Sequence, residues 1–443
     1  MFIKVINREI KELSMIAIPL IVQNIACMLI GLVDQIFIGH ISTEAYGAIG
    51  IAVSLMNFMA GVFGMLATAF NILGAKRIGE GNKEQFRILF MSSILIDCIV
   101  GIVYGILSVI GCKVIYQQLY GLAGEALEIA IIYTRIMCLY MLVQMLIFTM
   151  NSYYKIKKNT SKLMSIAVLS TLINAILDYI LIYGKFGMPQ LGATGAAISS
   201  IVSVLFNMIV LIFQVRKELV FHISELLIYF KNIRVLIKES LPLIGEELLE
   251  GSIFIVVINA IISNIGIKEI GAYLLVKNIL EIVMISMYMY GAAELTLVSE
   301  KCGEKRKNEI ETLTFSGIFI TEIIFVVISM LVFCGKNIIP RLISNDETLV
   351  IYASDIILPM IIMNLFNPIQ VIYKYVLQAL GEAKYVLYVT AIVNFLSLFC
   401  IFLLKENAFG MVSVFVGLFI NYFIISMIYN RRTNKVINKL FDK

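Results

Sequence analysis

The feature that most constrains this chain is a series of long apolar blocks that carry almost no charge. The block 191–215 contains no charged residue at all. At about 1.5 Å of rise per residue, a helix of this length crosses the hydrocarbon core of a bilayer, which is about 30 Å thick. Of the 443 residues, 60% are hydrophobic and 15% are charged, whereas about 25% are charged in a typical soluble domain. The chain lacks the polar groups to cover a water-soluble surface, so we expect an integral membrane protein.

The spans are predicted to be helices. Inside lipid every backbone polar group must find a partner within the protein, which leaves helices and closed barrels. The alternating ten-residue segments typical of barrels are absent from the sequence. We therefore predict an all-α integral membrane protein with twelve transmembrane helices, near residues 13–38, 45–74, 88–111, 126–153, 163–183, 191–215, 235–263, 269–298, 309–334, 347–375, 384–404 and 408–430.

The distribution of basic residues predicts the orientation of the chain. An even number of spans puts both termini on one side, and positive charge concentrates in cytoplasmic segments. The termini and the loops on their side hold 27 of the 35 Lys and Arg residues, whereas the opposite loops hold six. The loops on the side of the termini are predicted near residues 75–87, 154–162, 216–238, 300–308 and 374–384. Two basic residues, Arg135 and Lys277, remain inside spans. We expect a multi-pass protein of the cell (inner or plasma) membrane with cytoplasmic N- and C-termini.

The two halves of the chain repeat one another. The Pro-Leu-Ile sequence at 19–21 recurs at 242–244, and further matches keep an offset of 223 to 224 residues. Six spans per half give both halves the same orientation, so the two six-helix bundles are related by a parallel pseudo-two-fold repeat. We predict an N-terminal lobe (1–216), a cytoplasmic linker (217–234) and a C-terminal lobe (235–443), with alternating access by rocking of the lobes.

Acidic residues inside the first six spans predict a cation site. Asp34 lies in the first span, while Asn174 and Asp178 lie four residues apart on one face of the fifth. Ionisable residues in spans are costly and normally face protein or a water-filled cavity. Carboxylate, amide and hydroxyl oxygens suit Na⁺, and desolvation of two carboxylates also favours reversible protonation of one of them. The alternative is that these side chains are satisfied by neighbouring hydroxyls or amides and only fix the packing.

The second half carries acids of its own. Glu246, Glu247 and Glu250 crowd the seventh span, and this excess of carboxylates suits a cationic substrate. Lys277 and Glu281, four residues apart, are expected to neutralise each other. Glu294, near the cytoplasmic end of the eighth span, is expected to be solvated.

Several functional classes are disfavoured by missing motifs. The sequence has no phosphate-binding GxxxxGK[ST] loop, no HExxH and no GxSxG motif, so we expect no enzyme and no cofactor beyond a coupling ion. Basic residues confined to short loops indicate no nucleic-acid partner. A membrane-embedded enzyme or a receptor ranks last, because the longest predicted loop has only about 20 residues. We expect a monomer whose partners are membrane lipid and a small organic cation or amphipathic substrate.

The whole chain resembles the bacterial multidrug and toxic compound extrusion (MATE) family. The resemblance is carried by residues 19–24 and 31–34, by residues 75–81, and most specifically by residues 174–178 and 183–189. It implies a cation-coupled (Na⁺ or H⁺) antiporter for drugs and other toxic compounds, with a coupling-ion or metal site at Asp34, Asn174 and Asp178, completed by Ser200. We expect the substrate contacts at Gln23, Glu247, Glu250 and Glu281.

The chain departs from this family at one position of the tenth span. One branch of the family has an aspartate where this sequence has Asn367, so a second cation site in the C-terminal lobe stays open. The alternative function is a flippase for lipid-linked saccharides with a related two-lobe architecture. Such a flippase would need arginines for phosphate, and the predicted spans offer few cationic residues.

Overall fold

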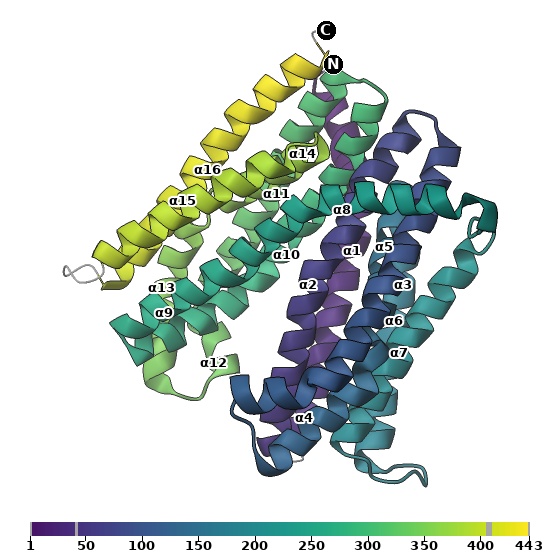
Figure 1. Cartoon of the computed structure of the whole chain (residues 1–443). Helices are drawn as coiled ribbons and strands as arrows, with labels where there is room; N and C mark the ends of the chain where they lie inside the picture. Colours follow the sequence, from purple (N-terminus) through teal and green to yellow (C-terminus); the bar gives the residue numbers. More distant parts are fainter. Residues whose placement is uncertain (1, 40–42, 405–409, 442–443) are drawn as a thin grey trace. The chain divides into compact units, whose positions relative to one another are not determined.

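The computed structural model describes the backbone of residues 2–39, 43–404 and 410–441, and these ranges contain helices but no strand (Figure 1). The side chains of residues 2–5, 30, 32–36, 38, 39, 43 and 441 lie outside the described part. The chain divides into two compact units that do not follow the sequence in order. The N-unit comprises Ile18–Arg77 and Gly81–Ser240, and the C-unit comprises Met1–Ala17, Ile78–Glu80 and Leu241–Lys443.

The N-unit is built from the longer part of α1 and from α2 to α7. Its elements are α1 (Phe2–Gly39), α2 (Thr43–Gly79), α3 (Lys83–Val114), η1 (Ile115–Leu119), α4 (Gly124–Ile136), η2 (Met137–Leu139), α5 (Tyr140–Ile156), α6 (Thr160–Tyr183), α7 (Ala193–Val215) and η3 (Ile223–Glu225), followed by the start of α8 (Leu226–Leu248). The predicted linker 217–234 is therefore partly helical, because α8 begins at Leu226. The lobe boundaries at 216 and 235 stay a prediction.

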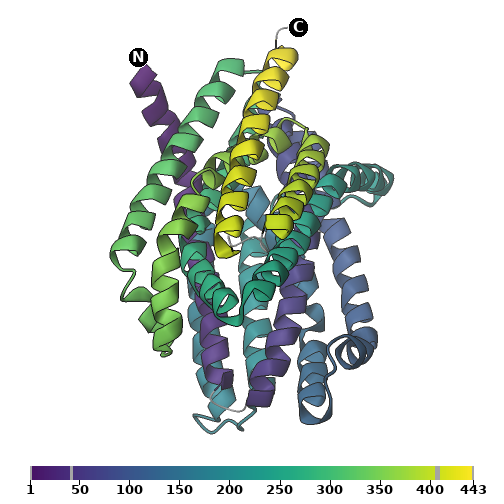
Figure 2. The same ribbon diagram turned by 90° about the vertical axis from the view of Figure 1, so that its left-hand side faces the viewer.

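The C-unit is arranged around the long helix α10. Its elements are η4 (Leu249–Phe254), α9 (Ile255–Ile265), α10 (Ile267–Gly303), α11 (Lys307–Cys334), α12 (Ile339–Ile343), α13 (Glu347–Met363), α14 (Asn367–Ala379), α15 (Ala383–Leu404) and α16 (Gly410–Phe441). α10 packs against α11, α13 and α14. In its apolar 18-residue stretch, 61% of the residues are buried. α15 and α16 lie side by side (Figures 1 and 2). The buried aliphatic side chains of α10 lie at the centre of the hydrophobic core of this unit.

The described helices fit the predicted membrane architecture. Eleven of them in the described ranges are long and apolar enough to cross a bilayer, and the number is twelve if the bent pair α13–α14 is one span. Their outward faces are apolar. On α3, for example, Ile102, Ile106 and Ile110 follow at four-residue intervals and are all exposed, as expected for a lipid-facing stripe.

The predicted tenth span is not one straight helix. α13 ends at Met363 and α14 begins at Asn367, with a bend of 42° between them. Pro368 lies in the first turn of α14, where its missing N–H costs no helical hydrogen bond. At the opposite end of α13, Asp346 caps the helix by accepting a hydrogen bond from the Thr348 backbone N–H at 2.9 Å. The Thr348 hydroxyl and the cap amides hold the pKa of Asp346 below its ordinary value.

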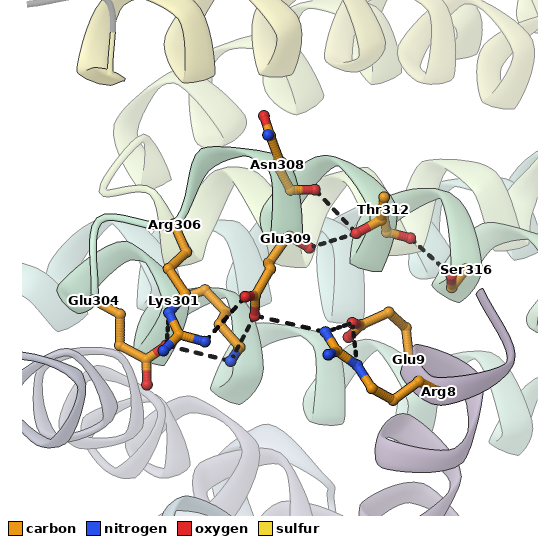
Figure 3. A network of polar contacts seen from close by, with 9 residues as sticks. All are labelled: Arg8, Glu9, Lys301, Glu304, Arg306, Asn308, Glu309, Thr312 and Ser316. Carbon is orange, nitrogen blue, oxygen red and sulfur yellow. Dashed lines mark hydrogen bonds and ion pairs between the residues drawn. The ribbon is translucent and has the colours of Figure 1, made fainter. Parts of the chain in front are cut away.

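A network of ion pairs ties the first residues of α1 into the C-unit (Figure 3). Lys301 Nζ, on the last turn of α10, lies 2.9 Å from Glu309 Oε2 at the start of α11. Arg306 in the turn between these helices contacts the same carboxylate at 3.0 Å. Arg8 reaches Glu309 at 4.0 Å and Glu9 at 2.7 Å. Through Arg8, the start of α1 therefore contacts α11 of the C-unit.

Candidate functional site

The predicted acid and amide of the N-unit are buried together on one helix face. Asn174 and Asp178 lie on α6 with no exposed surface. Ser199 and Ser200 on α7 are buried as well, and the Ser199 hydroxyl donates to Asp178 Oδ1. The four-residue spacing thus places carboxylate, amide and hydroxyl oxygens in the same buried layer, which is a donor set suited to Na⁺ or to a proton.

The close approach of α6 and α7 explains the contact between Ser199 and Asp178. A Cβ on Gly195 would lie 2.8 Å from the Leu181 carbonyl carbon, so only glycine fits there. The Leu191 backbone N–H also donates to the Leu181 carbonyl at 2.9 Å. Ser199 lies one turn after Gly195, on the same face of α7, and therefore meets α6 one turn before Leu181, at Asp178.

Ser199 was not among the site residues that we predicted from the sequence, which named its neighbour Ser200. Both serines are buried, and the hydroxyl that donates to Asp178 Oδ1 is that of Ser199. The role predicted for Ser200 stays a prediction. The family resemblance pointed to Ser200 as the residue that completes the site. The helical offset from Gly195 would have pointed to Ser199.

Asn174 has an unusual environment for a buried amide. Neither its nitrogen nor its oxygen has a hydrogen-bond partner among the described residues. Buried amides are normally paired, and an orphaned amide calls for an ion or water that satisfies it. Asp34 lies on α1, and its side chain is outside the described part of the structure. Gln23, another residue of α1, donates weakly to Asn151 Oδ1 on α5 at 3.4 Å.

No metal cluster of three or more His, Cys, Asp or Glu side chains occurs in the described ranges. The described polar groups next to Asp178 are instead amide and hydroxyl groups, those of Asn174 and Ser199. Neutral oxygens of this kind suit a hard monovalent ion or a proton better than a transition metal.

Two of the predicted acids of the C-unit, Glu246 and Glu250, contact a lysine that we predicted to lie in a loop. Lys374 was assigned to the loop 374–384, but it lies inside α14, and its side chain is 13% exposed. Its Nζ is 3.1 Å from Glu246 Oε1 and 3.0 Å from Glu250 Oε2. That prediction was wrong because α14 continues without a break through Lys374 to Ala379. Gln378, one turn later, donates to Glu246 Oε2 at 2.7 Å.

The other predicted substrate acids lie in less enclosed positions. Glu247 is half-buried, and its carboxylate lies over Gly251, where a Cβ would be 2.9 Å from Oε1. The predicted pairing of Lys277 with Glu281 is confirmed, with 3.8 Å between Nζ and Oε1. Glu281 is more than half exposed. Contacts of these residues with substrate remain predictions.

Glu294 was expected to be solvated, and this expectation was wrong. It is fully buried on α10, and both carboxylate oxygens lack a hydrogen-bond partner among the described residues. Gly317 on α11 provides the space, because a Cβ there would lie 2.5 Å from Glu294 Oε2. The position near the end of a span suggested solvent, but α10 is buried along most of its length.

Asn367, the departure noted in the tenth span, is paired with another asparagine. Its Nδ2 donates to Asn364 Oδ1 at 3.0 Å, and both residues are buried in the bend between α13 and α14. An amide therefore stands at this bend, where the resemblance led us to look for a carboxylate.

Comparison with known proteins places this arrangement in context. The profile of the MatE family matches residues 19–180 and again residues 242–403. The two matches are offset by 223 residues, which confirms the internal repeat predicted from the sequence.

Individual relatives are distant but extensive. The chain is 21% identical over 359 residues to a probable multidrug resistance protein NorM of Thermotoga maritima, covering 81% of this chain and 76% of that protein. It is 25% identical over 399 residues to a protein of the same description from Photorhabdus laumondii, covering 86% and 84%. The crystal structure of MATE in complex with MaL6 superposes with a TM-score of 0.87 at 17% identity, covering 98% of both chains. That likeness confirms the all-α two-bundle fold.

Proposed function

Because this chain belongs to the MatE family of membrane transporters, we propose that it exports organic cations, or other toxic amphipathic compounds, in exchange for Na⁺ or H⁺. The exchange proceeds by alternating access in the cell (inner or plasma) membrane. The coupling ion binds in the N-unit, and the cationic substrate binds among the carboxylates of the C-unit.

One observation carries this proposal: Asn174 and Asp178 are fully buried on one face of α6, with the Ser199 hydroxyl on the carboxylate. A buried carboxylate in a span is costly and is normally retained for a function. The packing alternative accounts for the hydrogen bond between Ser199 and Asp178, but it leaves the amide of Asn174 without a partner among the described residues. An ion or a protonated acid would use that amide.

Two further observations support export of cations. Relatives from two bacteria carry the description of multidrug resistance proteins. In the C-unit, Glu246, Glu247 and Glu250 gather near one ammonium group, that of Lys374, which pairs with two of them. The flippase alternative is not favoured, because this acidic surrounding would repel a phosphate rather than bind one.

The proposal is tested in proteoliposomes that contain purified protein and a fluorescent organic cation. Gradients of Na⁺ and of pH are imposed separately. We expect one of them to drive transport. Exchange of one cation for one monovalent substrate moves no net charge, so a membrane potential alone, which supplies about 2.3 kcal/mol per charge at 100 mV, has no effect.

Asp178→Asn keeps the shape of the side chain and removes its charge. We expect it to abolish gradient-driven transport while the protein still inserts, and Asp34→Asn to do the same. Asp355→Asn, an exposed position on α13, is the matched control and retains transport. Transport at the wild-type rate by the Asp178 variant would refute the assignment of the coupling site.

A further inference from the structure

The carboxylates of the C-unit already hold a cation, and that cation is part of the chain. Lys374 Nζ bridges Glu246 Oε1 at 3.1 Å and Glu250 Oε2 at 3.0 Å. These partners are 124 residues or more from Lys374 in the sequence. α14 and the α8–η4 segment therefore meet through this ammonium group.

The two glutamates are not equivalent partners. Glu246 has a 5% exposed side chain, and its second oxygen accepts from Gln378 Nε2 at 2.7 Å. Glu250 has a 28% exposed side chain and one oxygen on Lys374. Glu246 is thus the buried anchor of the lysine, with the ion pair on one oxygen and a hydrogen bond on the other, whereas Glu250 is the partner that solvent, or a ligand, can reach.

Local backbone geometry presents Glu250 for exchange. It lies in the π-helical segment η4, a wide turn of a kind frequently found at functional sites. Gly251 follows directly, and its missing side chain leaves room for the carboxylate of Glu247. Two partly exposed carboxylates, those of Glu247 and Glu250, therefore lie within one turn of each other, and the Lys374 ammonium group pairs with Glu250 and with the buried anchor.

An aromatic surface lies next to the same ammonium group. The Tyr375 ring centroid is 5.8 Å from Lys374 Nζ. Gly291 on α10 makes room for this ring, since a Cβ there would be only 2.3 Å from Tyr375 Cδ2. An organic cation gains from a ring face as well as from carboxylates.

We infer that Lys374 is a tethered competitor of the exported cation: an organic monocation binds at Glu247 and Glu250 by displacing the lysine ammonium from Glu250, while Glu246 keeps hold of it. This inference rests on the proposed function for the class of ligand, and it assigns Lys374 the role of setting the affinity. Without cargo, the lysine compensates the carboxylates, so the empty site does not carry isolated charges in a low-dielectric bundle. Cargo can leave because the lysine takes its place.

The experiment measures equilibrium binding of tetraphenylphosphonium to the purified full-length protein in detergent. Lys374→Met alone would leave buried Glu246 without its counter-ion and destabilise the fold, so the informative variant is Glu246→Gln with Lys374→Met. This pair of changes removes one positive and one negative charge, and it preserves a hydrogen-bond partner for Gln378. Should it fail to fold, Glu246→Leu with Lys374→Leu replaces the buried ion pair by apolar groups.

We expect the double variant to bind tetraphenylphosphonium about tenfold more tightly than the wild type, which corresponds to one lost competing ion pair. Adding Glu250→Gln should cancel the gain. Lys374→Arg keeps a positive charge that competes for Glu250, so this variant should bind tetraphenylphosphonium as weakly as the wild type does. Lys384→Met, which removes an exposed lysine at the start of α15 in the same unit, controls for charge alone and leaves the affinity unchanged.

Equal affinity of the double variant and the wild type would overturn the inference, and so would a gain that survives Glu250→Gln. Binding in detergent does not require coupled transport. If binding changes as expected but no ion gradient drives export in vesicles, the proposed function fails and the role of Lys374 stands. If export is coupled but the variants bind alike, the proposed function stands and the role of Lys374 fails.

Discussion

Ser199 is the residue at which the ion-binding and packing interpretations of the N-unit can be separated. Its hydroxyl contacts Asp178, and a hydrogen bond to a charged group contributes about 1.5–3 kcal/mol. If Asp178 binds the coupling ion, Ser199→Ala should raise the ion concentration for half-maximal exchange by about tenfold or more. If Asp178 only fixes the packing, that concentration stays constant and only the thermal stability falls. Ser165→Ala is the control, because the hydroxyl of this exposed α6 residue bonds to the carbonyl of Ser161 in its own helix.

At the same scale, the sequence could predict which polar residues share a helix but not what faces them from another helix. Asn174 and Asp178 were found because their spacing is a property of one helix. Lys374 was missed because its partners, Glu246 and Glu250, lie in a different part of the chain. Glu294 was misjudged for the same reason, since its burial depends on Gly317 of α11. Helical periodicity gives no information about such neighbours.

At the scale of whole helices, α3 packs closely against the η2–α5 segment because two of its residues are glycines. A Cβ on Gly101 would lie 2.5 Å from Leu142 Cα, and one on Gly105 would lie 2.6 Å from Cys138 O. Small residues four apart allow helices in membranes to pack closely. We expect Gly101→Val to destabilise the protein by about 1–3 kcal/mol through overpacking. The chain has no Trp, so unfolding is followed by circular dichroism of the detergent-solubilised protein.

Gly50→Val on α2 is the matched control, because no atom of the described residues lies within 4 Å of its Cβ position. Both variants place the same β-branched residue in a helix, so their intrinsic helix propensities cancel in the comparison. An equal loss of stability in the two variants would contradict the packing role of Gly101.

The elements themselves were largely predictable, because lipid leaves an uncharged block of about 20 residues little choice but a helix. Twelve predicted spans correspond to the described helices once α13 and α14 are counted as one span. The bend between these two was not predicted. Its cause is local, since Pro368 lies in the first turn of a new helix, but no charged residue lies near the bend to mark the end of a span.

For the molecule as a whole, the orientation in the membrane is a consequence of charge that the sequence predicts and a labelling experiment can check. Removing Lys374 from the loops lowers the count on the side of the termini from 27 to 26, against six on the opposite side, so the expected cytoplasmic location of both termini is unchanged. Single cysteines at Lys158, between α5 and α6, and at Met188, between α6 and α7, are placed in a variant that lacks the seven native cysteines. A membrane-impermeant maleimide added to intact cells should label position 188 and leave position 158 unlabelled until the cells are permeabilised. The opposite pattern would mean that the protein has the inverted orientation in the membrane, with its basic loops facing outward. It would contradict the predicted cytoplasmic location of both termini.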